Sequence, residues 1–492
     1  MNFENFQRYF KPGQIVPVYR RLNADFLTPV MAYLKIKTEG EFSFLLESVI
    51  KGQHLGRYSF IGSSPIDSIS FHLPMVRSKK KIDPNSNSKN FFSQLQSRLK
   101  SYQSITINDL PRFTGGAVGF IGYDMIRQIE EIPGPKQDPV QIPDSVMAFY
   151  HNLVAFDHLK NQVILIVNII VEEDSHPKLL YREAQSRLDQ LTEKLNSPLD
   201  LDLKFSADIG KLHSNFSKEE FQKAVEKGKE HIYAGDIFQV VLSHRMEVPF
   251  SGDTFQIYRS LRNINPSPYL FFLDFHDFQL IGSSPEPLIR VENREAEIIP
   301  IAGTRPRGNT PEEDKALSEN LLKDPKELAE HVMLVDLARN DMARVSEYGS
   351  VEVNDFQTIE SYSHVMHIIS RVNGKLEVQY DAVDAFKAAF PAGTVSGAPK
   401  IRAMEIINDL EPEKRGYYAG AIGYFDYNGN MDMCIAIRTL LAKDNTIYFQ
   451  AGAGIVADSD PATEYQETIN KGNALRSAIE QASGGIDDFI HR

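Results

Sequence analysis

The stretch QAGAGIVADSDPATEYQET, residues 450–468, decides how the C-terminal part of the chain folds. Its first seven residues belong to IYFQAGAGIV, 447–456, which predicts a strand that runs into Gly452-Ala453-Gly454. The Asp460-Pro461 pair after it predicts a helix with an aspartate N-cap and a proline at N1. A second Asp-Pro pair, at 324–325, predicts another helix of the same kind. We therefore expect a strand followed by a capped helix here, and a similar capped helix earlier in the chain.

Both predicted helices carry two glutamates three residues apart, Glu327 with Glu330 and Glu464 with Glu467. At this spacing the two carboxylates of one helix share a face. Two such faces brought together would offer hard oxygen ligands to Mg²⁺, completed by substrate oxygens or water. Glutamates near a helix start also serve in capping, and acidic chains hold many such pairs. The spacing alone leaves a metal site and an ordinary helix face both open.

The other candidate groups each have two interpretations. The small residues at 452–454 fit a carboxylate cradle or a tight turn between strands, and they lack the glycine spacing of dinucleotide or ATP loops. Arg438 is suited to a planar carboxylate ligand or to a structural ion pair. His367 is suited to general acid catalysis or to a place in the core. No G-x-S-x-G elbow occurs and Cys434 lacks the sharp turn of a nucleophile, so a covalent hydrolase is not expected.

The composition predicts a globular chain that works in the cytoplasm. Its 492 residues are 42% hydrophobic, enough for a large core. The net charge of −13 argues against nucleic-acid and membrane partners, although a local cation can still bind a small anion. A single cysteine excludes an intrachain disulfide framework. The apolar run at 163–171 is too short to cross a membrane and predicts a buried strand, and the N-terminus has no signal-peptide pattern.

The chain divides into two long regions on pattern alone. A helix is predicted over about 176–195 because apolar residues recur at helical spacing. The following residues lack any period, so we assign 1–195 and 216–492 as two regions and 196–215 as the linker. A polar loop is expected at 78–90.

Two short segments recur in the same order. IGSSP occurs at 61–65 and at 281–285, and AVGFIGYD at 117–124 is similar to AIGYFDY at 421–427. The repeats indicate either two halves with related antiparallel sheets or a chance likeness between turn-rich strands.

Taken together, these segments resemble the chorismate-binding enzymes, and most closely the anthranilate synthase component I group of that family. The resemblance extends from about residue 15 to about residue 480. Its most specific stretches are PIAGTRPRG (300–308), LLKDPKELAEHVMLVDLARND (321–341), PAGTVSGAPKIRAMEII (391–407) and the stretch quoted first. The implied fold class is α/β (α+β), a two-lobed anthranilate/aminodeoxychorismate synthase-like fold with antiparallel sheets between outer helices.

The resemblance implies a cleft that holds chorismate, with Mg²⁺ on one of its two carboxylates. The residues implied for chorismate are Arg438, Tyr418, Gly303, Thr304 and the backbone of Gly452, Ala453 and Gly454. Those implied for Mg²⁺ are Glu330 and Glu467, with Glu327 and Glu464 supporting through water. Those implied for catalysis are His367 and Glu286, as groups that move protons, together with Thr394 and Lys400.

The implied lyase reaction aminates chorismate at C2, expels the C4 hydroxyl and eliminates pyruvate to leave anthranilate, the first step of tryptophan biosynthesis. Relatives that add water carry a lysine base where this chain has Gln239. Relatives that make aminodeoxychorismate tend to have a lysine nucleophile where it has Ala302. Both differences favour ammonia as the nucleophile and anthranilate as the product.

The resemblance also implies a partner and a regulator. Ammonia would come from glutamine through a glutamine amidotransferase subunit, component II, in a heterotetramer. FLLESV at 44–49 resembles the family's feedback site for L-tryptophan, with Ser48 on one wall and Pro268, Tyr269 and Leu270 on the other.

Two other functions stay open on the sequence alone. An aminodeoxychorismate or aminodeoxyisochorismate synthase would differ in its product, and Ala302 argues against the first of these. A catalytically silent tryptophan-binding regulator has no need of the set Glu330, Glu467, His367 and Arg438, which this chain retains.

Overall fold

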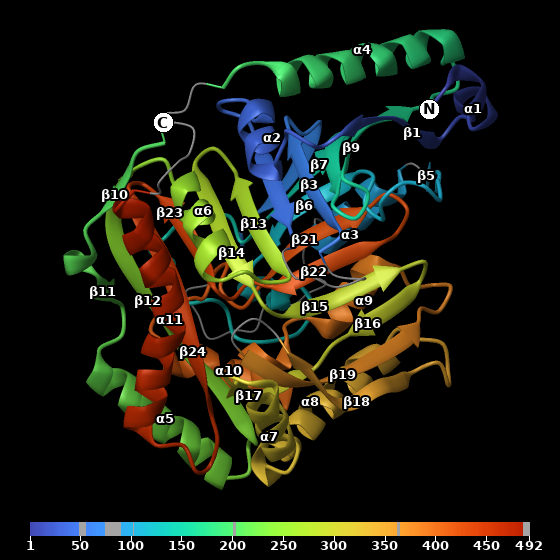
Figure 1. Cartoon of the computed structure of the whole chain (residues 1–492). Coiled ribbons are helices and arrows are strands. Elements are labelled where there is room, and N and C mark those ends of the chain that lie inside the picture. Colours follow the sequence, from blue (N-terminus) through green and yellow to red (C-terminus); the bar gives the residue numbers. More distant parts are fainter. Residues whose placement is uncertain (49–55, 74–89, 102, 200–202, 362–364, 486–492) are drawn as a thin grey trace.

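The computed structural model describes residues 1–48, 56–73, 90–101, 103–199, 203–361 and 365–485. The loop expected at 78–90 lies outside them except for its last residue. Within them, two β-sheets form the centre of the molecule and helices cover the outside (Figure 1). The expected fold class, α/β with antiparallel sheets and outer helices, is confirmed.

The larger sheet follows one long pairing path, and two short strands join it at β12. Its order is β10 (Phe205–Ala207), β12 (Gln239–Gly252), β24 (Thr446–Ile455), β23 (Thr439–Lys443), β14 (Phe278–Ser284), β13 (Tyr269–Asp274), β2 (Ser43–Glu47), β3 (Tyr58–Ser63), β8 (Asn152–Asp157), β9 (Gln162–Ile170), β1 (Gln14–Asn23) and β5 (Gln103–Ser104), with β11 (His213–Ser214) and β20 (Gly397–Ala398) on β12. The smaller sheet runs β17 (Ile301–Pro306), β19 (Val365–Lys375), β16 (Glu295–Ile298), β15 (Pro287–Glu292), β22 (Met431–Ile435), β21 (Ala421–Asp426), β6 (Gly116–Ile121), β7 (Ser145–Tyr150) and β4 (Asp67–Phe71), with β18 (Glu352–Ser361) on β19.

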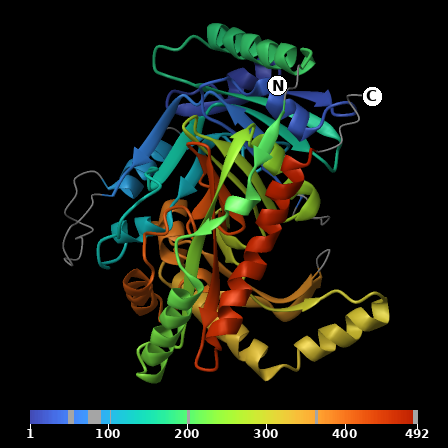
Figure 2. The ribbon, with the colours of Figure 1, turned by 90° about the vertical axis from the view of Figure 1, so that its left-hand side faces the viewer.

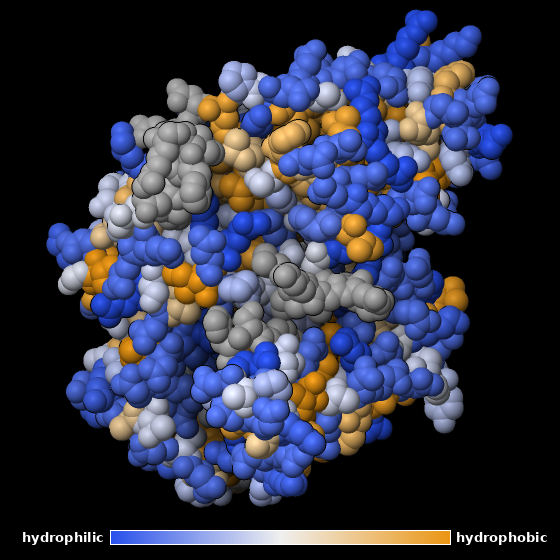
Figure 3. All heavy atoms as spheres, in the orientation of Figure 1, coloured by the Kyte–Doolittle hydropathy of each residue, from blue (hydrophilic) through white to orange (hydrophobic). Residues whose placement is uncertain are grey.

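The helices lie on the outer sides of these sheets, with α4 at one end of the molecule and α7 and α8 at the other (Figures 1 and 2). They are α1 (Phe3–Arg8), α2 (Pro29–Ile36), α3 (Phe91–Lys100), α4 (Pro177–Asn196), α5 (Lys218–Tyr233), α6 (Phe255–Ile264), α7 (Pro311–Leu321), α8 (Pro325–Ala343), α9 (Ala382–Ala389), α10 (Lys400–Leu410) and α11 (Pro461–Ser483), with short 3-10 turns η1 (Tyr123–Gln128), η2 (Ile209–Lys211) and η3 (Gly393–Val395). The helix predicted at 176–195 is α4, and the strand predicted at 163–171 is β9. None of the described helices is long and apolar enough to cross a membrane. Hydrophilic side chains predominate on the face shown in Figure 3.

Two apolar cores lie on the two faces of the larger sheet. On β13, Phe271 and Leu273 enter the core between the sheets, while Leu270 and Phe272 enter the core beneath the outer helices. This alternation is the period of two expected for a strand that is covered on both faces. The second core takes apolar residues from α2, α4, α6 and α11.

Both sheets combine strands from the two predicted regions, 1–195 and 216–492. The segment 196–215, expected as a linker, itself supplies β10 and β11 to the larger sheet. The segment 196–215 therefore separates two regions of the sequence, but it does not separate two independent sheets.

The strand order indicates two copies of one unit. In the path β24-β23-β14-β13-β2-β3-β8-β9, the pair β13–β2 lies at the centre. Outward from it, β14, β23 and β24 on one side correspond to β3, β8 and β9 on the other. The smaller sheet is matched in the same way about the β21–β6 pair. The equivalent elements are β1 and β12, α2 and α6, β2 and β13, β3 and β14, β4 and β15, β6 and β21, β7 and β22, β8 and β23, β9 and β24, and α4 and α11.

The register supports the interpretation of related halves. Gly119 pairs with Gly423, and these glycines are equivalent in the repeat AVGFIGYD and AIGYFDY. In the IGSSP repeat, a Cβ on Gly62 would meet the Phe44 ring at 2.4 Å, and one on Gly282 would meet the Phe271 ring at 2.2 Å. Both sites thus use glycine to seat an aromatic ring from the neighbouring strand.

Replacement of either glycine at the centre of the smaller sheet should destabilise the fold. A Cβ on Gly119 would lie 1.9 Å from the Val146 carbonyl oxygen, and one on Gly423 would lie 2.0 Å from that of Asp432. We expect Gly119→Ala to lower the free energy of unfolding by about 3 kcal/mol, as in other overpacked cores. Urea unfolding followed by circular dichroism measures this. Gly484→Ala is the control, because its nearest atoms are 3.7 Å away, and equal stability of the two variants would contradict the register.

Candidate functional site

Most of the predicted site residues line one cavity of about 750 Å³, which we call the α8–α11 cavity after two of the helices that border it. The predicted residues that line it are Glu286, Gly303, Thr304, Glu327, Glu330, His367, Thr394, Arg438, Gly454, Glu464 and Glu467. A cavity of about 110 Å³, which we call the strand-edge cavity, adds Tyr418 and Gly452. Glu286, Thr394 and Arg438 line both, so the two cavities form one continuous site.

One wall of the strand-edge cavity is an edge of β24 to which no described strand pairs. β23 pairs with β24 only as far as Phe449. Beyond that point the Gly452 carbonyl accepts a hydrogen bond from Lys471 Nζ at 3.1 Å, so the N–H of the same residue faces the same side. A Cβ on Gly452 would lie 2.9 Å from the Tyr418 hydroxyl. Only glycine therefore fits, and its N–H is placed to meet an anion.

Arg438 follows β22 with a left-handed backbone, at φ 49°. Its guanidinium donates to the Lys471 carbonyl. Burial lowers the pKa of Arg438, and the nearby Glu286 and Tyr418 act in the opposite sense. A half-buried guanidinium on an unusual backbone conformation is the kind of group that holds an anionic ligand.

Glu286 lies where the two cavities meet. Its Oε2 accepts a hydrogen bond from the Thr394 hydroxyl at 3.0 Å. Burial raises the pKa of Glu286, while the Thr394 hydroxyl, Lys471 and Arg438 act to lower it. The net rise brings its protonated form closer to neutral pH, as a proton donor requires.

His367 is held by the strand opposite. It pairs with Thr304 across β17 and β19, next to an irregularity in the register at Gly303. Its Nδ1 lies 3.2 Å from the Gly303 carbonyl oxygen and 3.0 Å from the Thr304 hydroxyl. Gly303 has φ 72°, and a Cβ there would meet a Glu327 oxygen at 3.1 Å. Burial lowers the pKa of His367, which makes its protonated form a stronger acid.

The four glutamates enter the cavity from the first two turns of α8 and α11. Both helices have the predicted caps, since Asp324 and Asp460 accept from backbone N–H groups and proline follows each. Each of three carboxylates has a polar partner, and these pairs are Glu327 with Arg305 at 3.0 Å, Glu330 with Gln239 at 3.3 Å, and Glu467 with Lys471 at 2.6 Å. Burial and the neighbouring Glu467 raise the pKa of Glu464.

These carboxylates fit Mg²⁺ only together with other oxygens. In the part of the chain that the structure describes, no three acidic, histidine or cysteine side chains form a closed metal site. Mg²⁺ is usually bound by one or two carboxylates and completed by water and substrate oxygens. Glu330 and Glu467, from two helices that border one cavity, supply such a pair.

Two predicted residues are not brought into the site. Lys400 lines neither cavity, because its Nζ donates to Asp341 at 2.8 Å and to the Ala389 carbonyl. Its charge is therefore used in an ion pair between α10 and α8 and does not reach the site as expected. Ala453, whose backbone was the expected contact, lines neither cavity. Its side chain is fully buried in the core beneath α5 and α10, because alternation on β24 turns it away from the two glycines.

Lys471 lines both cavities and was missed by the sequence analysis. It contacts Glu467, the Gly452 carbonyl and, through its own carbonyl, Arg438. It lies four residues after Glu467 on α11, so helical spacing from the predicted glutamate is the signal that would have found it.

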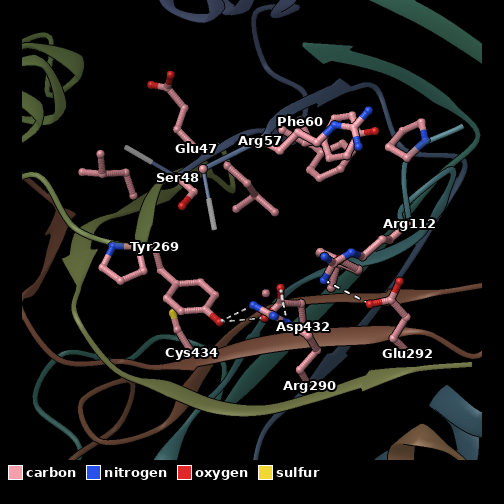
Figure 4. Close-up of a pocket in the computed structure, with 18 of the residues that line it drawn as sticks. Glu47, Ser48, Arg57, Phe60, Arg112, Tyr269, Arg290, Glu292, Asp432 and Cys434 are labelled. Atoms are coloured by element: carbon pink, nitrogen blue, oxygen red, sulfur yellow. Dashed lines mark hydrogen bonds and ion pairs between the residues drawn. The ribbon is translucent and has the colours of Figure 1, made fainter. Parts of the chain in front are cut away.

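A third cavity of about 720 Å³, which we call the inter-sheet cavity, lies between the sheets (Figure 4). All four residues of the expected tryptophan site line it. They are Ser48, Pro268, Tyr269 and Leu270. The Ser48 hydroxyl oxygen is buried and has no hydrogen-bond partner among the described residues. On the floor, the Tyr269 hydroxyl donates to Asp432 at 2.9 Å, and Asp432 pairs with Arg290 at 3.2 Å. Pro268 lines both this cavity and the α8–α11 cavity.

Comparisons with known proteins identify the family of the chain. Residues 41–477 match the model of the chorismate binding enzyme family. The chain is 45% identical to anthranilate synthase component 1 of Cereibacter sphaeroides, over 98% of both chains, and 46% identical to that of Aquifex aeolicus, also over 98% of both.

Solved structures share the fold. The crystal structure of anthranilate synthase component I from Streptococcus pneumoniae superimposes with a TM-score of 0.76 at 41% identity, covering 93% of this chain and 99% of that one. The menaquinone-specific isochorismate synthase of Escherichia coli has the same fold, with a TM-score of 0.72 at 18% identity over 97% of this chain and 98% of its own. The chain belongs to the chorismate-binding enzyme family and, within it, to the enzymes of the anthranilate synthase component 1 type.

Proposed function

We propose that this enzyme converts chorismate and ammonia to anthranilate, pyruvate and water in a Mg²⁺-dependent reaction. The observation that carries the proposal is the single site in which two pairs of glutamates face Arg438, His367 and Glu286. Chorismate has two carboxylates, so it requires positive charge at two places. Arg438 with the N–H of Gly452 supplies one place, and the glutamates would hold the cation that supplies the other.

Glu330 and Glu467 would hold Mg²⁺, with Glu327 and Glu464 as supporting carboxylates. Bound there, the ion neutralises a substrate carboxylate and fixes its orientation. In the structure Lys471 pairs with Glu467 and Arg305 pairs with Glu327. These two cations offset the repulsion between the clustered carboxylates and hold them in position.

The reaction needs one group that donates a proton and one that removes a proton. Ammonia adds at C2 while the C4 hydroxyl departs as water, which requires a proton at that oxygen. Loss of the C2 proton and of pyruvate then gives the aromatic ring. His367 is positioned by the Gly303 carbonyl, and Glu286 has a raised pKa, so both are suited to these transfers.

The lining of the cavity supports ammonia as the nucleophile. Gln239 and Ala302 both line it, and neither side chain is a base or a nucleophile. Because the chain has one cysteine, which is buried, it cannot supply the thiolate of a glutaminase. A separate glutamine amidotransferase subunit, in a heterotetramer in the cytoplasm, would release ammonia from glutamine.

Purified enzyme with chorismate, Mg²⁺ and excess ammonium should form fluorescent anthranilate and an equal amount of pyruvate. Product analysis by chromatography separates this function from its alternatives. An aminodeoxy product would assign the chain to the aminodeoxychorismate or aminodeoxyisochorismate branch. Unchanged chorismate with folded protein would favour a silent regulator.

Loss of either central glutamate should weaken Mg²⁺ binding and lower the Mg²⁺-dependent activity. We expect Glu330→Gln and Glu467→Gln each to lower kcat/KM about 100-fold or more, because an amide is a far weaker ligand for Mg²⁺. Steady-state kinetics over a Mg²⁺ titration measure the effect. Glu480→Gln is the control on the same helix, since Glu480 pairs with Arg476 on the surface. Activity retained at saturating Mg²⁺ in both variants would remove these residues from the metal site.

We also propose that L-tryptophan binds the inter-sheet cavity and inhibits the enzyme. The cavity offers aromatic walls, the unpartnered Ser48 hydroxyl and the charged floor of Arg290 and Asp432, which suit an aromatic amino acid (Figure 4). Pro268 lies on the wall that this cavity shares with the active site. A ligand that binds one arrangement of this wall better than another shifts the enzyme toward that arrangement.

The absence of tryptophan from the chain makes this binding directly measurable. The fluorescence of L-tryptophan should change when it is titrated with the protein, and the protein itself contributes only tyrosine emission as background. Ser48→Leu, which replaces the hydroxyl with a bulky apolar group on the cavity wall, should abolish that change and the inhibition by L-tryptophan while leaving activity in its absence. Inhibition that persists in Ser48→Leu would place the effector elsewhere.

A further inference from the structure

A fully buried ion pair lies directly behind the strand-edge cavity. The side chains of Arg415 and Glu411 are 1% and 3% exposed. They form a forked pair, with Arg415 Nε 2.9 Å from Glu411 Oε2 and Nη2 2.6 Å from Oε1. Burial acts to lower the pKa of Arg415, but Glu411 holds that pKa above its ordinary value, so the guanidinium stays charged.

The same guanidinium reaches three separate segments of the cavity wall. Nη2 donates to the Val241 carbonyl and Nη1 to the Val395 carbonyl, each at 2.7 Å. Its carbon lies 5.7 Å from the centre of the Tyr418 ring. All three of these residues line the strand-edge cavity, on β12, on η3 and in the loop before β21.

Glu411 extends the contact to a fourth position of the wall. Its Oε1 accepts from both the backbone N–H and the hydroxyl of Ser243, each at 2.8 Å. The Ser243 hydroxyl in turn accepts from Gln450 Nε2 at 2.8 Å, and Gln450 also lines the cavity. The ion pair thus holds β12, β24, η3 and the Tyr418 loop to one another.

We propose that Arg415, with Glu411, is a positioning residue that fixes the geometry of the substrate site from behind. This inference rests on the proposed function, because the ligand it positions is chorismate. Arg415 touches no reacting group, and its effect passes through Tyr418, whose hydroxyl lies against Gly452, and through the two carbonyls. A buried forked pair resists displacement because removal of either partner leaves an unpaired buried charge.

Arg415→Lys is the test, since lysine keeps the charge and loses the planar fork. We expect the Kd for chorismate and its KM to rise about tenfold or more, with a smaller change in kcat, because the binding wall shifts by a fraction of an ångström. Glu411→Gln should act in the same direction. Calorimetry with Mg²⁺ and without ammonia gives Kd, and anthranilate formation gives KM and kcat.

Arg127→Lys is the matched control. Arg127 is 2% exposed and pairs with Asp124 at 2.5 Å, but its other partners, the Pro133 carbonyl and Asn408, line neither cavity. If Arg415 has a purely structural role, both lysine variants should lose thermal stability, and the Kd for chorismate should be the same in the two. A rise in Kd confined to Arg415→Lys supports the inference, and an equal or absent rise in the two variants overturns it.

A second variant covers the case in which Arg415→Lys does not fold. Arg415→Ala leaves a cavity that a small guanidinium compound fits, so millimolar methylguanidinium should lower its KM toward the wild-type value. Failure of that rescue in folded Arg415→Ala counts against the inference. If the wild-type enzyme binds chorismate but forms no anthranilate, the proposed function is wrong, while the Kd for chorismate still tests the role of Arg415. If it does not bind chorismate, both the proposed function and this inference are wrong.

Discussion

The structure depends on two strand pairs that join its two related halves, β2 with β13 and β6 with β21. Each pair continues a sheet from one half into the other, so neither half closes a core alone. At the centre of the smaller sheet, Gly119 and Gly423 sit side by side with carbonyl oxygens from β7 and β22 where a Cβ would be. This spacing sets how closely the strands of the smaller sheet approach one another, and so how that sheet borders the core between the sheets.

The two halves are alike in their strands but only the second carries the site. Between β15 and β21 it holds the inserted elements β16 to β20 and α7 to α10, where the described residues of the first half form α3 and β5. The insertion supplies Thr304, Glu330 and His367, and the second half itself supplies Arg438 and Glu467. Local cations on these elements let a chain of net charge −13 hold a dianion.

Local sequence rules predicted the parts of this arrangement that short segments determine. The helix α4 followed from apolar spacing, and the caps of α8 and α11 from Asp-Pro pairs. The site residues came from the family resemblance, since spacing alone left the glutamates ambiguous. What stayed hidden depends on contacts between distant segments. Lys400 meets Asp341 through tertiary packing, and the mixed order of both sheets follows from pairings that no local pattern encodes.

The relation between the halves also explains why the space of the inter-sheet cavity is filled at the equivalent described positions of the other half. By the strand registers, four of its lining residues have phenylalanine at the equivalent position of the other half. These pairs are Ser48 with Phe275, Tyr58 with Phe278, Tyr269 with Phe42, and Tyr424 with Phe120. The Phe275 ring lies 4.9 to 5.6 Å from the centres of the other three rings and fills that side. Where the first half has serine in place of Phe275, the space stays open, so a ligand with an aromatic ring would restore packing that the other half already has.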